Sequence, residues 1–136
     1  MKILMAFLAD EANISQEGKL NVLGVFDRIS ANQFPVLHPR MVFAFRVHMD
    51  GGDSGRTFPV RVRLENEGGE ALFEASGDIV APMIGPGDFA TANQLFGLVG
   101  LQFAREGVHR FVVEVAGTEH ETPFLVQSPG HDPTLN

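Results

Sequence analysis

The sequence contains no cysteine, no tryptophan and no tyrosine. Without cysteine the chain can form no disulfide, no thiolate nucleophile and no cysteine-based metal site, which fits the cytoplasmic location that we expect. Every aromatic residue is one of twelve phenylalanines, so the amphipathic rings that enrich binding interfaces and stack on sugars or bases are missing. These absences disfavour carbohydrate-binding and single-strand-binding modules.

Positive charge and long hydrophobic runs are also scarce. Ten basic and 17 acidic side chains give a formal net charge of -7, which repels phosphate backbones, so we expect no nucleic-acid partner. No apolar segment reaches the roughly 20 residues that a membrane-spanning helix needs, so we expect no membrane partner. The apolar run at residues 3–9 ends at Asp10 and has no small-residue cleavage site, so we interpret it as a β-strand rather than a signal peptide.

The sequence does contain short segments in which apolar and polar residues alternate. Residues 41–49, 57–65 and 107–117 show this pattern, and clusters of turn-forming residues separate such segments. About eight of them, without a convincing amphipathic helix, predict an all-β fold, a single-domain antiparallel β-sandwich. We expect this domain to span residues 1–127 and residues 128–136 to form a mobile C-terminal tail.

Two local features follow from the same pattern. Residues 1–12 and 19–29 flank a turn cluster and predict the first hairpin, in which Gly24 marks a bulge or a close backbone approach. In a later hairpin, Glu74 is expected opposite Arg61 or Arg63 on the outer face. We therefore expect these arginines to form ion pairs across the hairpin.

The segments LADEAN (residues 8–13) and GKLNVLGVFD (residues 18–27) resemble a family of short bacterial proteins of unknown function. Its signature is L-A-D-x-A-N followed by G-K-L-N-x-L-G-x-F-D, and its closing strand is similar to GVHRFVVEVAG (residues 107–117). The chain has His109 where that family has an aromatic residue, and Glu11 where Tyr is common. The resemblance covers residues 1–127 and implies a cytosolic all-β domain; it implies no activity.

Several residue types in the sequence are candidates for chemistry. GDSG at residues 52–55 is similar to a serine-protease nucleophile motif, but a turn explains it without the long double-barrel domain that such catalysis needs. The five histidines are scattered without close ligand spacing, whereas aspartates in predicted loops offer the oxygen ligands that Ca²⁺ prefers. We assign no catalytic residue and no cofactor. The metal-ligand candidates are Asp50, Asp53, Asp78, Asp88, His109 and His120.

The leading functional hypothesis is a non-catalytic domain that acts through protein–protein contacts and self-associates as a homo-oligomer. The first hairpin and residues 94–103 are apolar on both faces, whereas a two-layer sandwich buries one face of each sheet. The second face needs a cover, either the predicted loop at residues 77–93 or another subunit. The alternative is a small-molecule or Ca²⁺-type site, with or without catalysis, where loops 50–55 and 77–93 meet.

Overall fold

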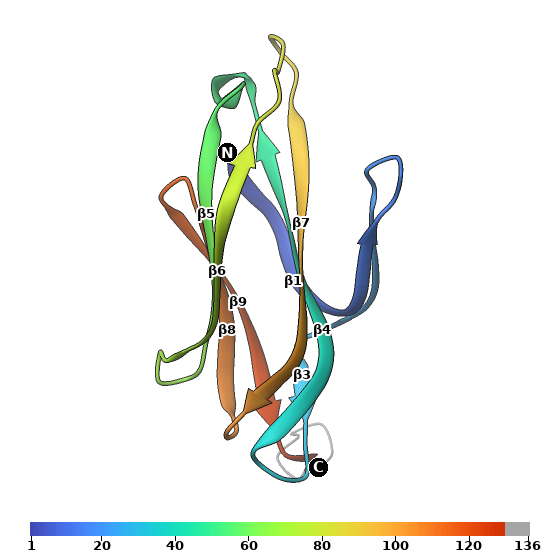
Figure 1. Ribbon diagram of the computed structural model, residues 1–136, viewed down its shortest axis with the longest axis vertical. Coiled ribbons are helices and arrows are strands. Elements are labelled where there is room, and N and C mark those ends of the chain that lie inside the picture. Colours follow the sequence, from blue (N-terminus) through green and yellow to red (C-terminus); the bar gives the residue numbers. More distant parts are fainter. Residues whose placement is uncertain (130–136) are drawn as a thin grey trace.

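The fold is an all-β sandwich of two sheets that pack face to face, as the sequence predicts (Figure 1). This computed structural model describes residues 1–129. Within that range one 3₁₀-helix, η1 (Gly51–Asp53), accompanies nine strands. The strands are β1 (Lys2–Ile14), β2 (Leu20–Phe26), β3 (Arg28–Ser30), β4 (Val36–Met49), β5 (Thr57–Glu65), β6 (Ala71–Val80), β7 (Ala90–Phe103), β8 (Gly107–Val115) and β9 (Thr118–Gln127).

One sheet has four strands in the order β2-β1-β4-β7, and the other has five in the order β3-β9-β8-β5-β6. Every neighbouring pair is antiparallel except β3 and β9, which run parallel. The edge strands of the four-stranded sheet are β2 and β7, and those of the five-stranded sheet are β3 and β6.

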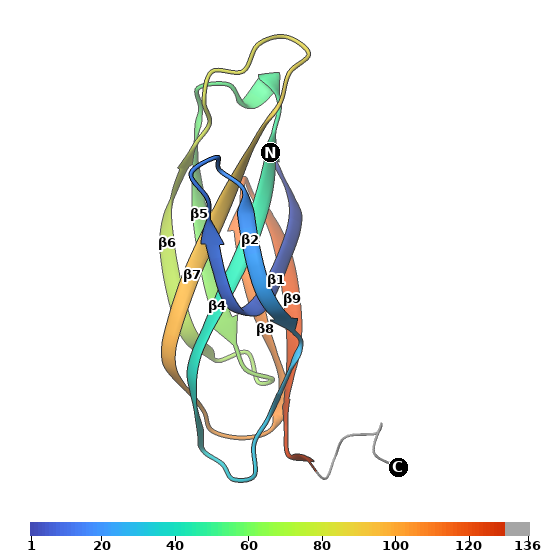
Figure 2. The same ribbon diagram turned by 90° about the vertical axis from the view of Figure 1, so that its right-hand side faces the viewer.

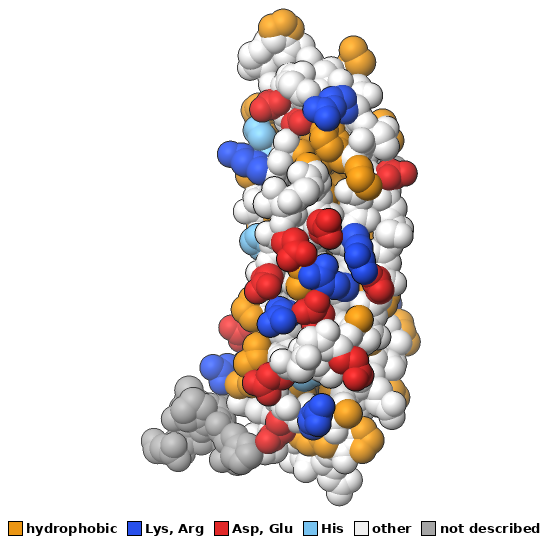
Figure 3. Space-filling view, turned by 90° about the vertical axis from the view of Figure 1, so that its left-hand side faces the viewer, with side chains coloured by type: hydrophobic (Ala, Val, Ile, Leu, Met, Phe, Trp, Pro, Cys, Tyr) orange, Lys and Arg blue, Asp and Glu red, His pale blue; other side chains and the backbone are white. Residues whose placement is uncertain are grey.

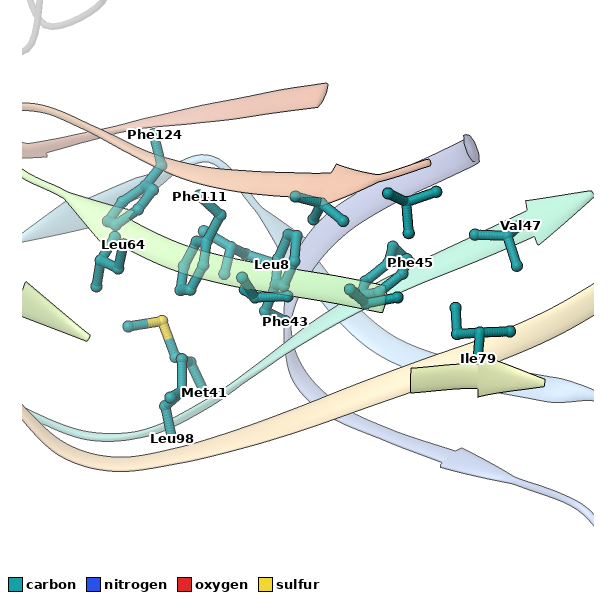
Figure 4. Close-up of a cluster of buried hydrophobic side chains, with 14 of the residues drawn as sticks. Leu8, Met41, Phe43, Phe45, Val47, Leu64, Ile79, Leu98, Phe111 and Phe124 are labelled. Carbon is teal, nitrogen blue, oxygen red and sulfur yellow. The ribbon is translucent and has the colours of Figure 1, made fainter. Parts of the chain in front are cut away.

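The core lies between the sheets and consists of the inward-facing side chains of both. Phe43 on β4 stacks on Phe111 of β8 with ring centroids 4.4 Å apart, and both side chains are fully buried. Met41 and Leu98 extend this layer in one direction and Phe45 in the other (Figure 4). Removing a buried phenylalanine from such a core costs about 3–5 kcal/mol, so this layer is a main source of stability.

The segment at residues 77–93, predicted to be one long loop, is a loop only at residues 81–89. Gly77 and Asp78 continue β6 and pair with Val60 and Pro59. Residues 90–93 belong to β7 and pair with β4. Both additions lie in edge strands, which pair on one side only and therefore tolerate glycine and neighbouring prolines that a central strand excludes.

The predicted C-terminal tail falls largely outside the described residues. Ser128, at its start, donates its backbone N–H to the carboxylate of Glu106. Residues 130–136 are not among those that the structure describes. Over residues 1–129, no helix has the length and apolar character that crossing a membrane requires.

Candidate functional site

The outer face of the five-stranded sheet is covered with paired charges (Figure 3). Arg63 contacts Glu65 at 2.6 Å and Glu119 at 3.1 Å, and Arg110 contacts Glu65 at 3.0 Å. The hydrogen bond from Arg63 is the largest of the effects that hold the pKa of the Glu65 carboxyl below its usual value. Arg61 pairs with Glu74, as predicted. Charges satisfied in this way make a face suited to water.

The outer face of the four-stranded sheet has an apolar centre instead. On β4, Val42 and Ala44 alternate with the core residue Phe43 and so point away from the core. Val42 is nevertheless only 2% exposed and Ala44 0%. Ala9 of β1, which pairs with Val42, is also fully buried. Something therefore covers this face from outside the sandwich.

The cover is the far end of the first hairpin. β1 pairs with β4 only as far as Ala9, while its pairing with β2 continues to Ile14. Beyond Ala9 the hairpin bends sharply and returns over the sheet, so it stands outside β4 and β7 in Figure 1 and in front of them in Figure 2. Gly24 makes the bend possible: its φ is +73°, and a Cβ there would lie 2.4 Å from Oδ2 of Asp10. The predicted close backbone approach at Gly24 is thus confirmed.

We call residues 11–23 the overlying hairpin, and its two faces differ. Ala12, Leu20 and Val22 share one face and are half-buried. Glu11 and Asn13 on the other face are exposed. This amphipathic pattern places the apolar side against the sheet and the polar side in water. The overlying hairpin is accordingly a partial third layer.

Two polar contacts hold the overlying hairpin to the sheet. The side-chain amide of Asn93 on β7 donates to the carbonyl oxygen of Gly18 at 3.3 Å. Arg40 on β4 donates to Glu11 at 2.9 Å. The loop at residues 81–89 does not serve as the cover, because it lies at the end of the sandwich (Figure 1). The prediction that this loop covers the second face of the sheet is therefore wrong. The chain's own overlying hairpin covers this part of the face instead.

Large apolar side chains remain exposed on the four-stranded sheet and on the overlying hairpin itself. Leu23 and Val25 on the edge strand β2 are 72% and 64% exposed, and Val99 on the opposite edge strand β7 is 73% exposed. Leu4, Met5 and Leu37 add to them. Several large apolar side chains exposed on one sheet favour a contact site there. The four-stranded sheet is therefore the candidate interaction surface.

The two loops of the alternative site do meet, as predicted. The backbone N–H of Ile84 donates to the Ser54 hydroxyl at 2.8 Å, and that of Gly55 donates to the Pro82 carbonyl at 3.1 Å. Ser54, the residue of the protease-like motif, thus anchors one loop to the other. Its hydroxyl also lies 3.9 Å from the sulfur of Met83. These contacts give Ser54 a structural role.

The aspartates at this junction are already engaged by the chain. Asp53 is buried, and its Oδ2 lies 3.0 Å from the N-terminal ammonium of Met1 and accepts the Asp50 N–H at 3.0 Å. The hydrogen bond from Asp50 and then that from the ammonium lower the pKa of Asp53. Asp50 in turn accepts the Gly52 N–H at 2.9 Å and caps η1. The carboxylate oxygens of Asp50 and Asp53 therefore accept hydrogen bonds from backbone N–H groups and do not point together toward a shared metal position.

The other candidate ligands lie far from one another in the fold. His109 lies near the start of β8 and is buried, with its ring in contact with the rings of Phe103 and Phe124. Asp78 is exposed on β6, Asp88 is exposed in the loop at residues 81–89, and His120 is half-buried on β9. Among residues 1–129, no three His, Cys, Asp or Glu side chains are grouped so as to hold a metal ion.

Nδ1 of His109 lies 3.0 Å from the carbonyl oxygen of Gly107. Because a carbonyl can only accept, the ring carries its proton on Nδ1. Burial is the largest effect on this ring, and it lowers the pKa of His109 below its usual value of 6.5. His109 is therefore a neutral, aromatic-like member of the core at neutral pH.

Comparison with protein-family models decides the family. A model described as "Family of unknown function (DUF6941)" matches residues 4–127, nearly the whole chain. The chain belongs to this family. A comparison with curated proteins found no match. Membership of DUF6941 brings no activity with it, so the function of this DUF6941 chain must be argued from its own surface.

The segments that carry the sequence resemblance form the least ordinary part of this DUF6941 chain. Residues 8–13 run through the bend and into the overlying hairpin, and residues 18–27 return from its tip to the sandwich. Sequence reasoning found Gly24 but missed Asn93, Leu23 and Val99. Alternation alone could have placed Leu23 and Val99 on apolar strands, but their position at the sheet edges required the structure. The contact from Asn93 to Gly18 spans 75 positions of the chain and has no local signal.

Proposed function

We propose that this chain is a non-catalytic domain that acts through protein–protein contacts and self-associates through its four-stranded sheet. The observation that carries the proposal is the concentration of exposed apolar side chains on that sheet, with Leu23, Val25 and Val99 each more than 60% exposed. Burying such side chains contributes about 25 cal/mol for each Å² removed from water, which favours association.

Charge supports the same choice of surface. A second copy also carries a formal charge of -7, so contact is favoured where acidic side chains are few, and β4 and β7 of the four-stranded sheet carry none. The outer face of the five-stranded sheet carries the acidic side chains Glu65, Glu74 and Glu119. Contact there would desolvate ion pairs that water already stabilises, at a cost that an apolar surface does not carry.

A protein partner also fits this surface better than a nucleic acid does. Arg40, Arg61, Arg63 and Arg110 each pair with a carboxylate of the chain itself, which reduces their attraction for phosphate. We propose a cytoplasmic location, which the absence of cysteine supports.

Hydrogen exchange at low and high protein concentration tests the choice of surface. We expect concentration-dependent protection of backbone amides in the four-stranded sheet and none on β5 and β8. Protection confined to the five-stranded sheet, or identical exchange at every concentration, would contradict the proposal. The measurement is made on the full chain, so it does not depend on whether a fragment folds.

The meeting of the two loops supports a second candidate, a Ca²⁺-type site at residues 50–55 and 81–89. Asp50 and Asp53 would have to give up their present hydrogen bonds to bind the ion. A bound ion stabilises the folded state by mass action, so the test is the melting temperature with calcium chloride and with chelator. A calcium-dependent rise that Asp50→Asn abolishes would favour this candidate, and equal melting temperatures would eliminate it.

A further inference from the structure

The edge strand β7 is long and entirely uncharged. It runs for 14 residues, from Ala90 to Phe103, with the sequence ATANQLFGLVGLQF, and it contains neither a charged residue nor a proline. It pairs with β4 along one side and is the last strand of its sheet on the other. An unpaired edge of this kind exposes backbone N–H and C=O groups that another strand can pair with.

The other edge strands carry features that resist such pairing. β6 bears Glu74 and Asp78, so two copies of β6 would bring like charges together. β3 has three residues. β2 is also uncharged, but it has seven residues and is bent at Gly24, where φ is +73°. In β7, Gly100 has a positive φ near one end, which leaves residues 90–99 as a regular edge.

We propose that β7 pairs antiparallel with β7 of a second copy of this chain, joining two four-stranded sheets into one continuous sheet of eight strands. This proposal rests on the proposed function and names the partner and the contact. The occupant is a second copy because identical antiparallel strands related by a two-fold axis are self-complementary, and because this edge adds no charge to two chains that each carry -7.

The surroundings of the edge fit an added strand. On the inner side, a groove between the two sheets is lined by Val60 of β5, by residues 75–79 of β6 and by Gln94 and Phe96 of β7, and Asp78 on β6 is the charged residue in this lining. Inward-facing side chains of the added strand would extend over this groove. On the outer side, Val99 is 73% exposed and would meet apolar side chains of the second copy. Main-chain pairing would supply affinity, and these side chains would set the register.

Sedimentation equilibrium on charged edge variants tests the proposal. Gly97 has an ordinary φ, and a Cβ there meets nothing within 4 Å, so Gly97→Glu is compatible with the fold. We expect Gly97→Glu and Val99→Lys each to raise the dissociation constant of the dimer about tenfold or more, because both place charge in the new ladder. Val108→Lys, at an exposed position of the five-stranded sheet, is the matched control and should leave it unchanged, whereas a weaker dimer in Leu23→Lys alone would assign the contact to the other edge of the four-stranded sheet. Unchanged melting temperatures show that each variant is folded.

Disulfide cross-linking gives an independent reading, because the chain has no cysteine of its own. Leu95→Cys, Gly97→Cys and Val99→Cys proteins are oxidised alone and in pairwise mixtures. Facing residues in an antiparallel ladder lie within the range that a disulfide spans, so we expect one combination to cross-link and Leu23→Cys not to.

The outcomes separate the two claims. A dimer that resists Gly97→Glu and Val99→Lys, yields no cross-link through β7 and dissociates in Leu23→Lys would overturn the β7 contact while leaving self-association intact. A monomer at every concentration, with no cross-link, would overturn both.

Discussion

The side chain of Asn93, on β7, donates a hydrogen bond to the backbone carbonyl of Gly18, at the tip of the first hairpin. This contact closes the overlying hairpin onto the four-stranded sheet. It spans residues that are 75 positions apart, and it ties the bend at Gly24 to the edge strand proposed as an interface.

Replacing Asn93 by alanine should loosen the overlying hairpin without unfolding the sandwich. A single neutral hydrogen bond contributes about 0.5–1.5 kcal/mol, so amides of residues 11–23 should exchange up to about tenfold faster. Asn21→Ala is the comparison, because it removes a side-chain hydrogen bond of the same kind, to Asn13, that lies within the hairpin. Equal exchange in the two variants would show that the contact to Gly18 does not hold the hairpin.

Replacing Gly24 by alanine should destabilise the protein by about 1–3 kcal/mol. The alanine must adopt a φ of +73°, and its Cβ would meet Oδ2 of Asp10 at 2.4 Å. Gly85→Ala is the matched control, because a Cβ at Gly85 would meet nothing within 4 Å and the φ there is ordinary. Urea denaturation measures both. Equal midpoints for the two variants would mean that the bend needs no glycine.

The buried ring of His109 should make stability fall as the solution is acidified. Because burial lowers its pKa in the folded protein below 6.5, the unfolded chain binds more protons as pH falls through about 6.5, and unfolding is favoured. His109→Phe keeps a ring between Phe103 and Phe124 and removes the proton-binding site. Between about pH 7.5 and about pH 5.5 the variant should lose less unfolding free energy than the parent. A greater or equal loss in the variant would refute this account of His109.

Asp53 should contribute stability at neutral pH that disappears in acid. Its pKa in the folded protein lies below the usual 3.8, so its contribution is complete above about 3.8 and is lost as pH falls through the lowered value. Asp53→Asn should therefore cost about 1–3 kcal/mol at neutral pH and progressively less below about pH 4. Asp78→Asn, at an exposed position on β6, should cost little at either pH. A cost for Asp53→Asn that is independent of pH would contradict this role.

Alternation in the sequence predicted the parts of the fold that depend on neighbouring positions. It identified the sandwich and the pairing of Glu74 with the arginines of β5, because side chains two residues apart share a face. It failed at residues 77–80 and 90–93, where glycine, proline and aspartate indicate a loop although the residues complete edge strands.

The candidate site depended on information that alternation does not contain. The pattern showed that the first hairpin is apolar on both faces, but not what covers the second face. The answer lies in a bend of the same hairpin at Gly24, which returns the start of β2 over β4 and β7. Likewise, Asp50 and Asp53 could be placed near each other from the sequence, whereas their capping hydrogen bonds required the structure.

The molar mass of the full chain as a function of concentration, measured by light scattering, tests the central claim most directly. We predict that the mass rises from that of a 14.8 kDa monomer to twice that value as concentration increases, and that the dimer persists in high salt because the contact is apolar and uncharged. A mass that stays at the monomer value over the whole concentration range would contradict it.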